Sequence, residues 1–146
     1  MEYLLIVVFS LLMIIPASLL FINYINDSKA NIVQSQVFKI GNELIVDSEQ
    51  MFSVGTNSWQ TIGIQIPESV TSLKVFNGTI SELEFKIGSD QTSEVVLFSK
   101  VPLFNATEDD CSNGCILNIH QGMNKIRIKS TTHSNGEGVI RLEVIS

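Results

Sequence analysis

Residues 1–22 read MEYLLIVVFSLLMIIPASLLFI, and this stretch decides the fold class. Glu2 is its only charged residue, and the next charge along the chain is Asp27. A run of about 20 apolar residues can cross the hydrocarbon core of a bilayer as one helix, whereas the apolar part of a secretory signal needs only about 7–15. A secretory signal has basic residues ahead of its apolar part, and no basic residue precedes this run. The stretch therefore predicts a membrane helix that is retained in the working protein.

The carboxylate of Glu2 lies at one end of this apolar helix. An unpaired carboxylate in a membrane costs several kcal/mol, so such a residue generally has a partner. The alternative is that Glu2 lies at the level of the lipid headgroups and is hydrated. The residue chemistry leaves both interpretations open.

A helical pattern continues beyond the apolar run. One apolar stripe recurs at three- and four-residue steps and comprises Val33, Val37, Ile40, Leu44 and, a heptad further on, Met51. We expect one helix over residues 1–54, with residues 1–25 in a membrane or filament core and residues 26–54 amphipathic and packed on the domain that follows. Pro16 removes one backbone hydrogen bond and is expected to kink or loosen the first half. Gly55 is a typical residue for the end of the helix.

From Trp59 onward, apolar residues alternate with a period of two in short segments separated by turn residues such as Asn77-Gly78. Residues 95–98 are apolar on both faces, which predicts a central strand covered on both sides. Residues 102–110 are expected to form one long connection. We predict an α+β protein, in which the long helix is followed, over residues 55–146, by an antiparallel β-sandwich head of about seven strands.

Two cysteines, Cys111 and Cys115, flank Ser-Asn-Gly. Asn-Gly favours a tight turn that would bring the two sulfurs close enough to bridge. Such a disulfide indicates an oxidising compartment outside the cytoplasm, and so short a loop would contribute about 2 kcal/mol. The alternative is a metal site that also uses His120 and His133, but this spacing matches no zinc pattern. We therefore expect no metal.

The composition and the motifs argue against a nucleic-acid-binding protein and against an enzyme. The formal net charge is −6, and the nine Lys and Arg residues are spread along the chain, whereas a nucleic-acid footprint needs clustered basic residues. A glycine-rich phosphate loop, Gly-x-Ser-x-Gly and His-Glu-x-x-His do not occur. Residues 108–110 are acidic but lack the alternating spacing of a calcium loop. We therefore expect no catalysis, no cofactor and no nucleic-acid partner.

Three Asn-x-Ser/Thr sequons begin at Asn26, Asn77 and Asn105. Asn26 follows the apolar run, and the other two fall in expected turns or loops of the head. All three are therefore candidates for N-glycosylation.

The opening Met1–Leu5, a hydrophobic helix that contains a proline, and a β-rich head together resemble the archaeal type IV pilins with class III signal peptides. In that family a membrane peptidase removes a short basic leader that ends in glycine. The leader, the glycine and the small residues ahead of Met1 do not occur in this sequence. The resemblance implies that Glu2, Tyr3, Leu4, Leu5 and Pro16 act in assembly, and that Glu2 meets the N-terminal amine of a neighbouring subunit.

This resemblance implies a structural subunit that is inserted in the membrane before assembly and then polymerises into an extracellular, surface-adhesive filament. Its partners would be identical subunits in a helical filament, the pilus assembly machinery and a signal peptidase. The alternative is a membrane-anchored extracellular β-sandwich that acts as a binding or stator protein of the swimming-filament machinery, or a swimming-filament subunit. The Met1–Leu5 motif favours the pilin, because a simple anchor does not need it.

Overall fold

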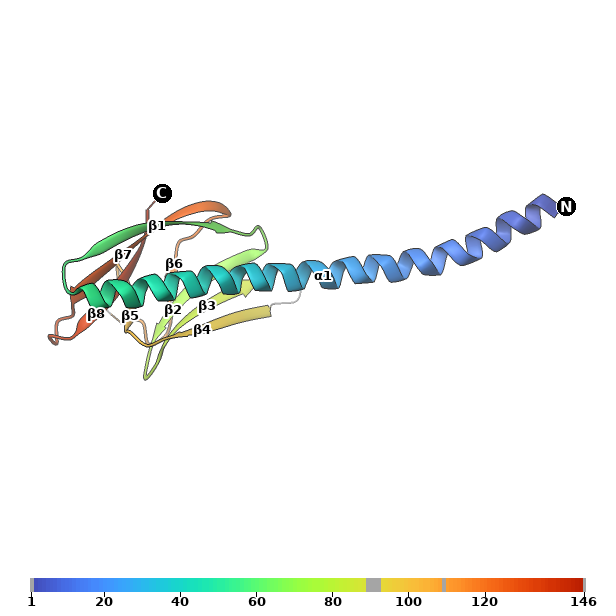
Figure 1. Ribbon diagram of the computed structural model, residues 1–146. Coiled ribbons are helices and arrows are strands. Elements are labelled where there is room, and N and C mark those ends of the chain that lie inside the picture. Colours follow the sequence, from blue (N-terminus) through green and yellow to red (C-terminus); the bar gives the residue numbers. More distant parts are fainter. Residues whose placement is uncertain (1, 89–92, 109, 146) are drawn as a thin grey trace. The chain divides into compact units, whose positions relative to one another are not determined.

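The computed structural model describes the backbone of residues 2–88, 93–108 and 110–145, and their side chains except at residues 2 and 26–30. The chain is α+β: a long N-terminal helix, α1 (Glu2–Val54), precedes all the strands (Figure 1). Two compact units, Met1–Val33 and Gln34–Ser146, meet at a boundary inside α1. The second half of α1 therefore belongs to the same unit as the strands.

The described residues contain eight strands in two four-stranded sheets. The strands are β1 (Trp59–Ile66), β2 (Val70–Asn77), β3 (Ser81–Ile87), β4 (Ser93–Ser99), β5 (Leu103–Asn105), β6 (Cys115–Leu117), β7 (Gly122–Thr132) and β8 (Gly138–Ile145). One sheet has the order β1-β7-β8-β5 and the other β4-β3-β2-β6. Neighbouring strands are antiparallel except β5 and β8, which run parallel. The expectation of purely antiparallel sheets is wrong at that one pair.

The second half of α1 packs on the strands through its apolar stripe. Val37 and Leu44 are fully buried and Met51 is nearly so, as the pattern predicted. Gly41 lies on the same buried side, and a Cβ atom added there would come within 2.7 Å of Leu97 Cδ1 in β4. A glycine therefore lets the helix approach this sheet closely, which the apolar pattern alone did not show.

The end of α1 is capped as the sequence predicted. Gly55 follows the last helical residue and has a φ of +109°, a value that glycine adopts without strain. The Ser58 hydroxyl donates hydrogen bonds to the carbonyl oxygens of Gly55, at 2.7 Å, and Met51, at 3.2 Å. This hydroxyl thus supplies a donor to a carbonyl that has no partner within the helix.

Alternation along the strands builds the core of the unit. The fully buried strand residues include Leu73, Val75, Leu83, Phe85, Leu103, Ile126, Ile128, Ile140 and Leu142. The hairpin expected at Asn77-Gly78 is present, because Asn77 and Ser81 are partners at the ends of β2 and β3. The residues that alternate with the core positions face outward and define two exposed sheet faces.

The structure corrects the prediction for residues 95–98. They lie in β4, which is an edge strand of its sheet and has only β3 as a neighbour. Leu97 is buried, but Val96 is 40% and Phe98 63% exposed. An apolar run predicts burial on both faces only if both faces are covered, and the sequence pattern does not contain that information.

The connection expected at residues 102–110 is also corrected. Residues Leu103–Asn105 form β5, and they pair with residues 140–142 of β8. A three-residue strand is too short to show alternation, and all three of its residues are buried. Only the neighbouring strand identifies it as part of a sheet.

Candidate assembly surface

The first described feature of the chain is a long apolar surface without a cover. Residues Tyr3–Ile25 form a helical segment of 23 residues that contains an 18-residue stretch with a mean hydropathy of 2.9, and none of that stretch is buried inside the chain. The core helix of a soluble protein can have this length and composition, but it would be mostly buried. The segment could therefore be a membrane anchor or a signal sequence, and it leaves a large apolar area to be covered by something else.

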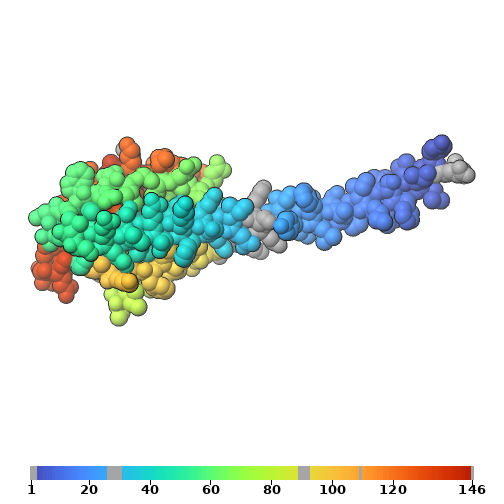
Figure 2. All heavy atoms as spheres, viewed as in Figure 1, coloured from blue at the N-terminus to red at the C-terminus, as the bar shows by residue number. Residues whose placement is uncertain are grey.

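This surface surrounds the helix. Successive residues of an α-helix are rotated by about 100°, so the five residues Leu4–Val8 cover its whole circumference. All five are apolar, and each is between 51% and 69% exposed. The segment, shown in blue in Figure 2, is thus apolar on every side. A helix with this pattern is stable in lipid or among other helices.

The polar atoms within the segment are satisfied locally. The hydroxyls of Ser10 and Ser18 donate to the carbonyl oxygens four residues earlier, Ile6 at 2.9 Å and Ile14 at 2.8 Å. These bonds let both serines lie in apolar surroundings. Pro16 has no amide hydrogen, yet α1 continues through it as an α-helix.

Four of the predicted assembly residues lie on this surface, and Pro16 is one of them. Tyr3, Leu4 and Leu5 are all strongly exposed, with Tyr3 at 85%. The backbone of Glu2 begins α1, but its side chain lies outside the described residues. The predicted pairing of Glu2 with a neighbouring subunit therefore stays a prediction.

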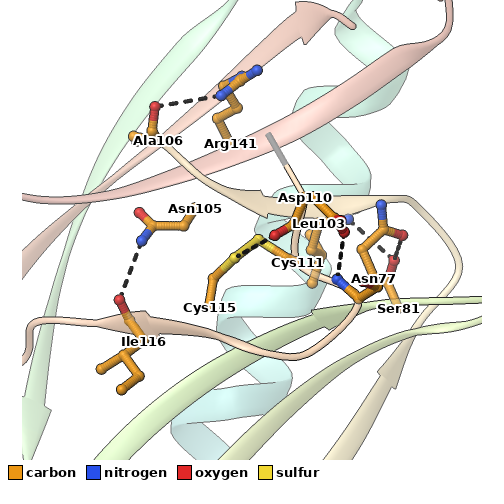
Figure 3. The surroundings of a disulfide bond; sticks show 11 residues. Asn77, Ser81, Leu103, Asn105, Ala106, Asp110, Cys111, Cys115, Ile116 and Arg141 are labelled. Atoms are coloured by element: carbon orange, nitrogen blue, oxygen red, sulfur yellow. Dashed lines mark hydrogen bonds between the residues drawn. A yellow bond between two sulfur atoms is a disulfide. The ribbon is translucent and has the colours of Figure 1, made fainter. Parts of the chain in front are cut away.

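A second structured feature is the disulfide loop, and here the prediction is confirmed. Cys111 and Cys115 are bonded, with their Cα atoms 5.0 Å apart (Figure 3). Gly114 has a φ of +87°, and its amide donates to the carbonyl oxygen of Cys111. A Cβ atom at Gly114 would also lie 2.6 Å from the ring of Phe76, so both backbone conformation and space require glycine here.

The disulfide loop contacts strands of both sheets. The amide of Asn77, at the end of β2, donates to Cys111 O at 3.0 Å. Both cysteines are buried in one cluster with Phe104 of β5 and Val139 of β8. The ring of His133 stacks on Phe104 with 5.2 Å between centroids. No pattern in the sequence predicts this packing of His133.

Asp110 precedes the first cysteine and shapes the entry to the loop. Its carboxylate Oδ1 accepts the amide hydrogen of Ser112 at 2.9 Å. Hydrogen bonds from the backbone and side chain of Ser112 hold the pKa of Asp110 below its ordinary value. Both cysteines are in the disulfide, so the alternative Cys/His metal site would lack its thiolate ligands, and the described residues contain no group of three or more His, Cys, Asp or Glu that could hold a metal.

The three sequons differ in their surroundings. Asn77 is half-buried, its Oδ1 accepts the Ser81 hydroxyl at 3.0 Å, and the described residues provide no partner for its Nδ2. Asn105 was expected in an accessible loop, but it lies in β5 and is only 8% exposed. Its Nδ2, the atom to which a glycan would be attached, donates to Ile116 O at 3.2 Å. The side chain of Asn26 lies outside the described residues.

An open groove of about 780 Å³ lies between the second half of α1 and β1. Of the lining residues that the structure describes, Glu43 and Glu68 supply the carboxylates and Lys39 is the only cation. Among the described residues that line it there is no histidine, cysteine or serine. The groove therefore offers no Ser–His or Cys–His pairing.

No protein-family model, no curated protein and no solved structure matches this chain.

Proposed function

We propose that this protein is the structural subunit of an extracellular filament of the archaeal type IV pilus kind, held together by its N-terminal helix. The observation that carries the proposal is the 23-residue apolar segment Tyr3–Ile25, which the chain itself leaves uncovered on every side. Before assembly the segment would lie in the membrane. In the filament, identical helices would replace the lipid, and the units formed by residues 34–146 would coat the outside.

The second half of α1 supports the proposal that the two halves of the helix have different roles. Val37 and Leu44 fill the core of the second unit, while Leu4 and Leu5 at the other end of the same helix are exposed. We also infer that the two sheets pack as a sandwich-type head. The head would face an oxidising environment, consistent with the disulfide, and would act in surface adhesion without catalysis.

The pilin proposal assigns Glu2 a partner in a neighbouring subunit. Each copy would dock on the next through a rotation that does not close, which gives a helical polymer. The assembly machinery and a signal peptidase would be further partners. Asn77 is the sequon of the head that we propose carries a glycan, because Asn105 is buried and its Nδ2 donates a hydrogen bond to Ile116 O.

The test is to shear filaments from the surface of the source cell, image them by electron microscopy and identify the repeating subunit by peptide mass. This chain should be that subunit. Its recovery only from detergent-extracted membranes, with no filaments, would overturn the proposal and favour a membrane-anchored binding protein.

A second experiment uses Glu2→Ala beside Glu108→Ala, which removes one exposed carboxylate of the head as a control. Glu2→Ala should leave the unfolding of the head unchanged and reduce the yield of filaments, while the control assembles normally. Equal yields from both variants would show that the partner of Glu2 is not needed.

A further inference from the structure

The exposed face of the sheet β1-β7-β8 gathers basic residues that are distant in sequence. Lys125, Arg127 and Lys129 alternate along β7 and therefore point to one side. Their cross-strand partners share that side, including Arg141 opposite Lys129 and Glu143 opposite Arg127. Four cations and one carboxylate give this face a formal charge of +3, in a chain whose net charge is −6.

The only tryptophan of the chain lies on the same face. Trp59 is opposite Lys129 in the register of β1 and β7, and it is 63% exposed. The guanidinium carbon of Arg127 lies 5.7 Å from the centre of its ring, and Arg127 is held in turn by Glu143 at 3.1 Å. The indole thus forms a cation–π contact with Arg127 and is still exposed to solvent. We call Trp59, Lys125, Arg127, Lys129, Arg141 and Glu143 the basic face.

Two cations of the basic face, Lys125 and Lys129, form no ion pair with any described residue. Arg127 is paired with Glu143, and Arg141 donates to the carbonyl oxygen of Ala106. In the described part of the chain, no carboxylate lies within ion-pair distance of the amines of Lys125 and Lys129. These two residues are four positions apart on an extended strand, so they are spaced by roughly 13 Å.

We propose that the basic face binds an anionic polysaccharide, with Trp59 as the surface on which a sugar ring stacks and Lys125 and Lys129 as contacts for its acid groups. One face of a pyranose ring consists mainly of C–H groups and packs on an indole as an apolar surface does. Lysines act as point charges without a fixed fork geometry, which suits carboxylates or sulfates that repeat along a polymer.

Charge complementarity selects this ligand. The rest of the chain carries an excess of negative charge, which disfavours binding of a polyanion elsewhere and would orient the polymer toward this face. Single-stranded nucleic acid also combines stacking with negative charge, but it carries a charge on every nucleotide and needs a continuous basic groove. One aromatic residue and two unpaired lysines fit a polymer of lower charge density. This inference adds a ligand class to the proposed adhesive filament. It rests on the proposed function only in placing the ligand outside the cell.

The experiment titrates the full, unassembled chain in a nonionic detergent with polygalacturonate and follows the fluorescence of Trp59, which has no competing tryptophan. We expect a saturable change that weakens as salt is added. Lys125→Glu with Lys129→Glu should weaken binding about tenfold, because two charge contacts become repulsive. The matched control is Lys74→Glu with Lys100→Glu, which changes the net charge equally on residues outside the basic face and should bind within about twofold of the parent.

Trp59→Ala, followed by co-sedimentation with polygalacturonate beads, should also lose about tenfold in affinity while the circular dichroism of the chain is unchanged. The proposal is overturned by the absence of a saturable signal, by equal binding of neutral dextran, by tighter binding of a single-stranded oligonucleotide, or by an equal loss in the control pair. Self-association of the chain that is abolished by the same two lysine changes, without polysaccharide binding, would instead assign the face to a second copy. Because binding is measured before assembly, an absence of filaments would defeat only the proposed function.

Discussion

The two halves of α1 carry the same kinds of residue in opposite surroundings. Leu4 and Leu5 are exposed, although they belong to the most apolar stretch of the chain. Leu44, in the same helix, is fully buried. The difference is periodicity, because residues 3–25 are apolar all round whereas residues 34–54 confine their buried apolar residues to one stripe. An amphipathic helix can be covered by its own domain, whereas a helix that is apolar on all sides needs lipid or other copies.

The largest expected effect tests the unit in which the second half of α1 is buried. Phe85→Ala removes a fully buried ring from the core and should lower the free energy of unfolding of the head by about 3–5 kcal/mol. Denaturant unfolding, followed by circular dichroism in detergent, measures it. Phe98→Ala is the matched control, because that ring is 63% exposed, and it should change stability by about 0.5 kcal/mol or less. Similar losses in both variants would contradict the assignment of β4 as an edge strand with an exposed outer face.

The next largest effect tests the exposed first half of α1. Leu12→Lys places a charge near the middle of Tyr3–Ile25 and should disfavour membrane insertion by about 3 kcal/mol, with no change in the unfolding of the head. The measurement is the fraction of the chain recovered with membranes. Val96→Lys, at an exposed position of β4, should leave that fraction unchanged. A destabilised head in Leu12→Lys would mean that the apolar segment contributes to the folding of the second unit.

The disulfide loop provides an intermediate effect. Replacing Cys111 and Cys115 together by serine should lower the free energy of unfolding by about 2 kcal/mol, since the bridge closes a very short loop. Unfolding of the parent with reductant should show the same loss, and reductant should not affect the double variant. If the loss is much smaller, the buried cluster with Phe104 and Val139 holds the loop without the bridge.

The smallest effect concerns two like charges on the second half of α1. Burial, and then the nearby carboxylate of Glu43 four residues earlier, raises the pKa of Asp47. Its ionised form is therefore less favourable in the folded chain than in the unfolded one, and ionisation costs stability as the pH rises. Asp47→Asn should increase the free energy of unfolding at pH 7 by about 0.3–0.5 kcal/mol.

This gain should disappear in acid. As the pH falls through the raised folded pKa and below the unfolded value of 3.8, the parent carboxyl is protonated in both states and its penalty vanishes. Glu108→Gln, at an exposed position of the head, is the control and should show no such gain. A variant that is less stable than the parent at pH 7 would show that Asp47 has a favourable partner.

Much of this architecture could be predicted from local signals. The apolar run, the Val37–Leu44 stripe and the stop at Gly55 are properties of neighbouring residues along a helix. The Cys111–Cys115 bridge depends on a turn of a few residues, so it could also be predicted from the sequence. No comparable local signal predicts β5, the edge position of β4 or the burial of Asn105, because each depends on a strand distant in the chain.

The sequence by itself determined that one long helix has an all-round apolar first half and a one-sided second half, because periodicity along a single helix is a local property. It also determined the alternation that makes Lys125 and Lys129 face the same side of a strand. Only the tertiary structure decided that Trp59 and Arg141 join them, and that Glu143 is the one carboxylate beside them. The physical reason is that hydrogen-bond register between distant strands, and not their spacing in sequence, brings scattered charges onto one face.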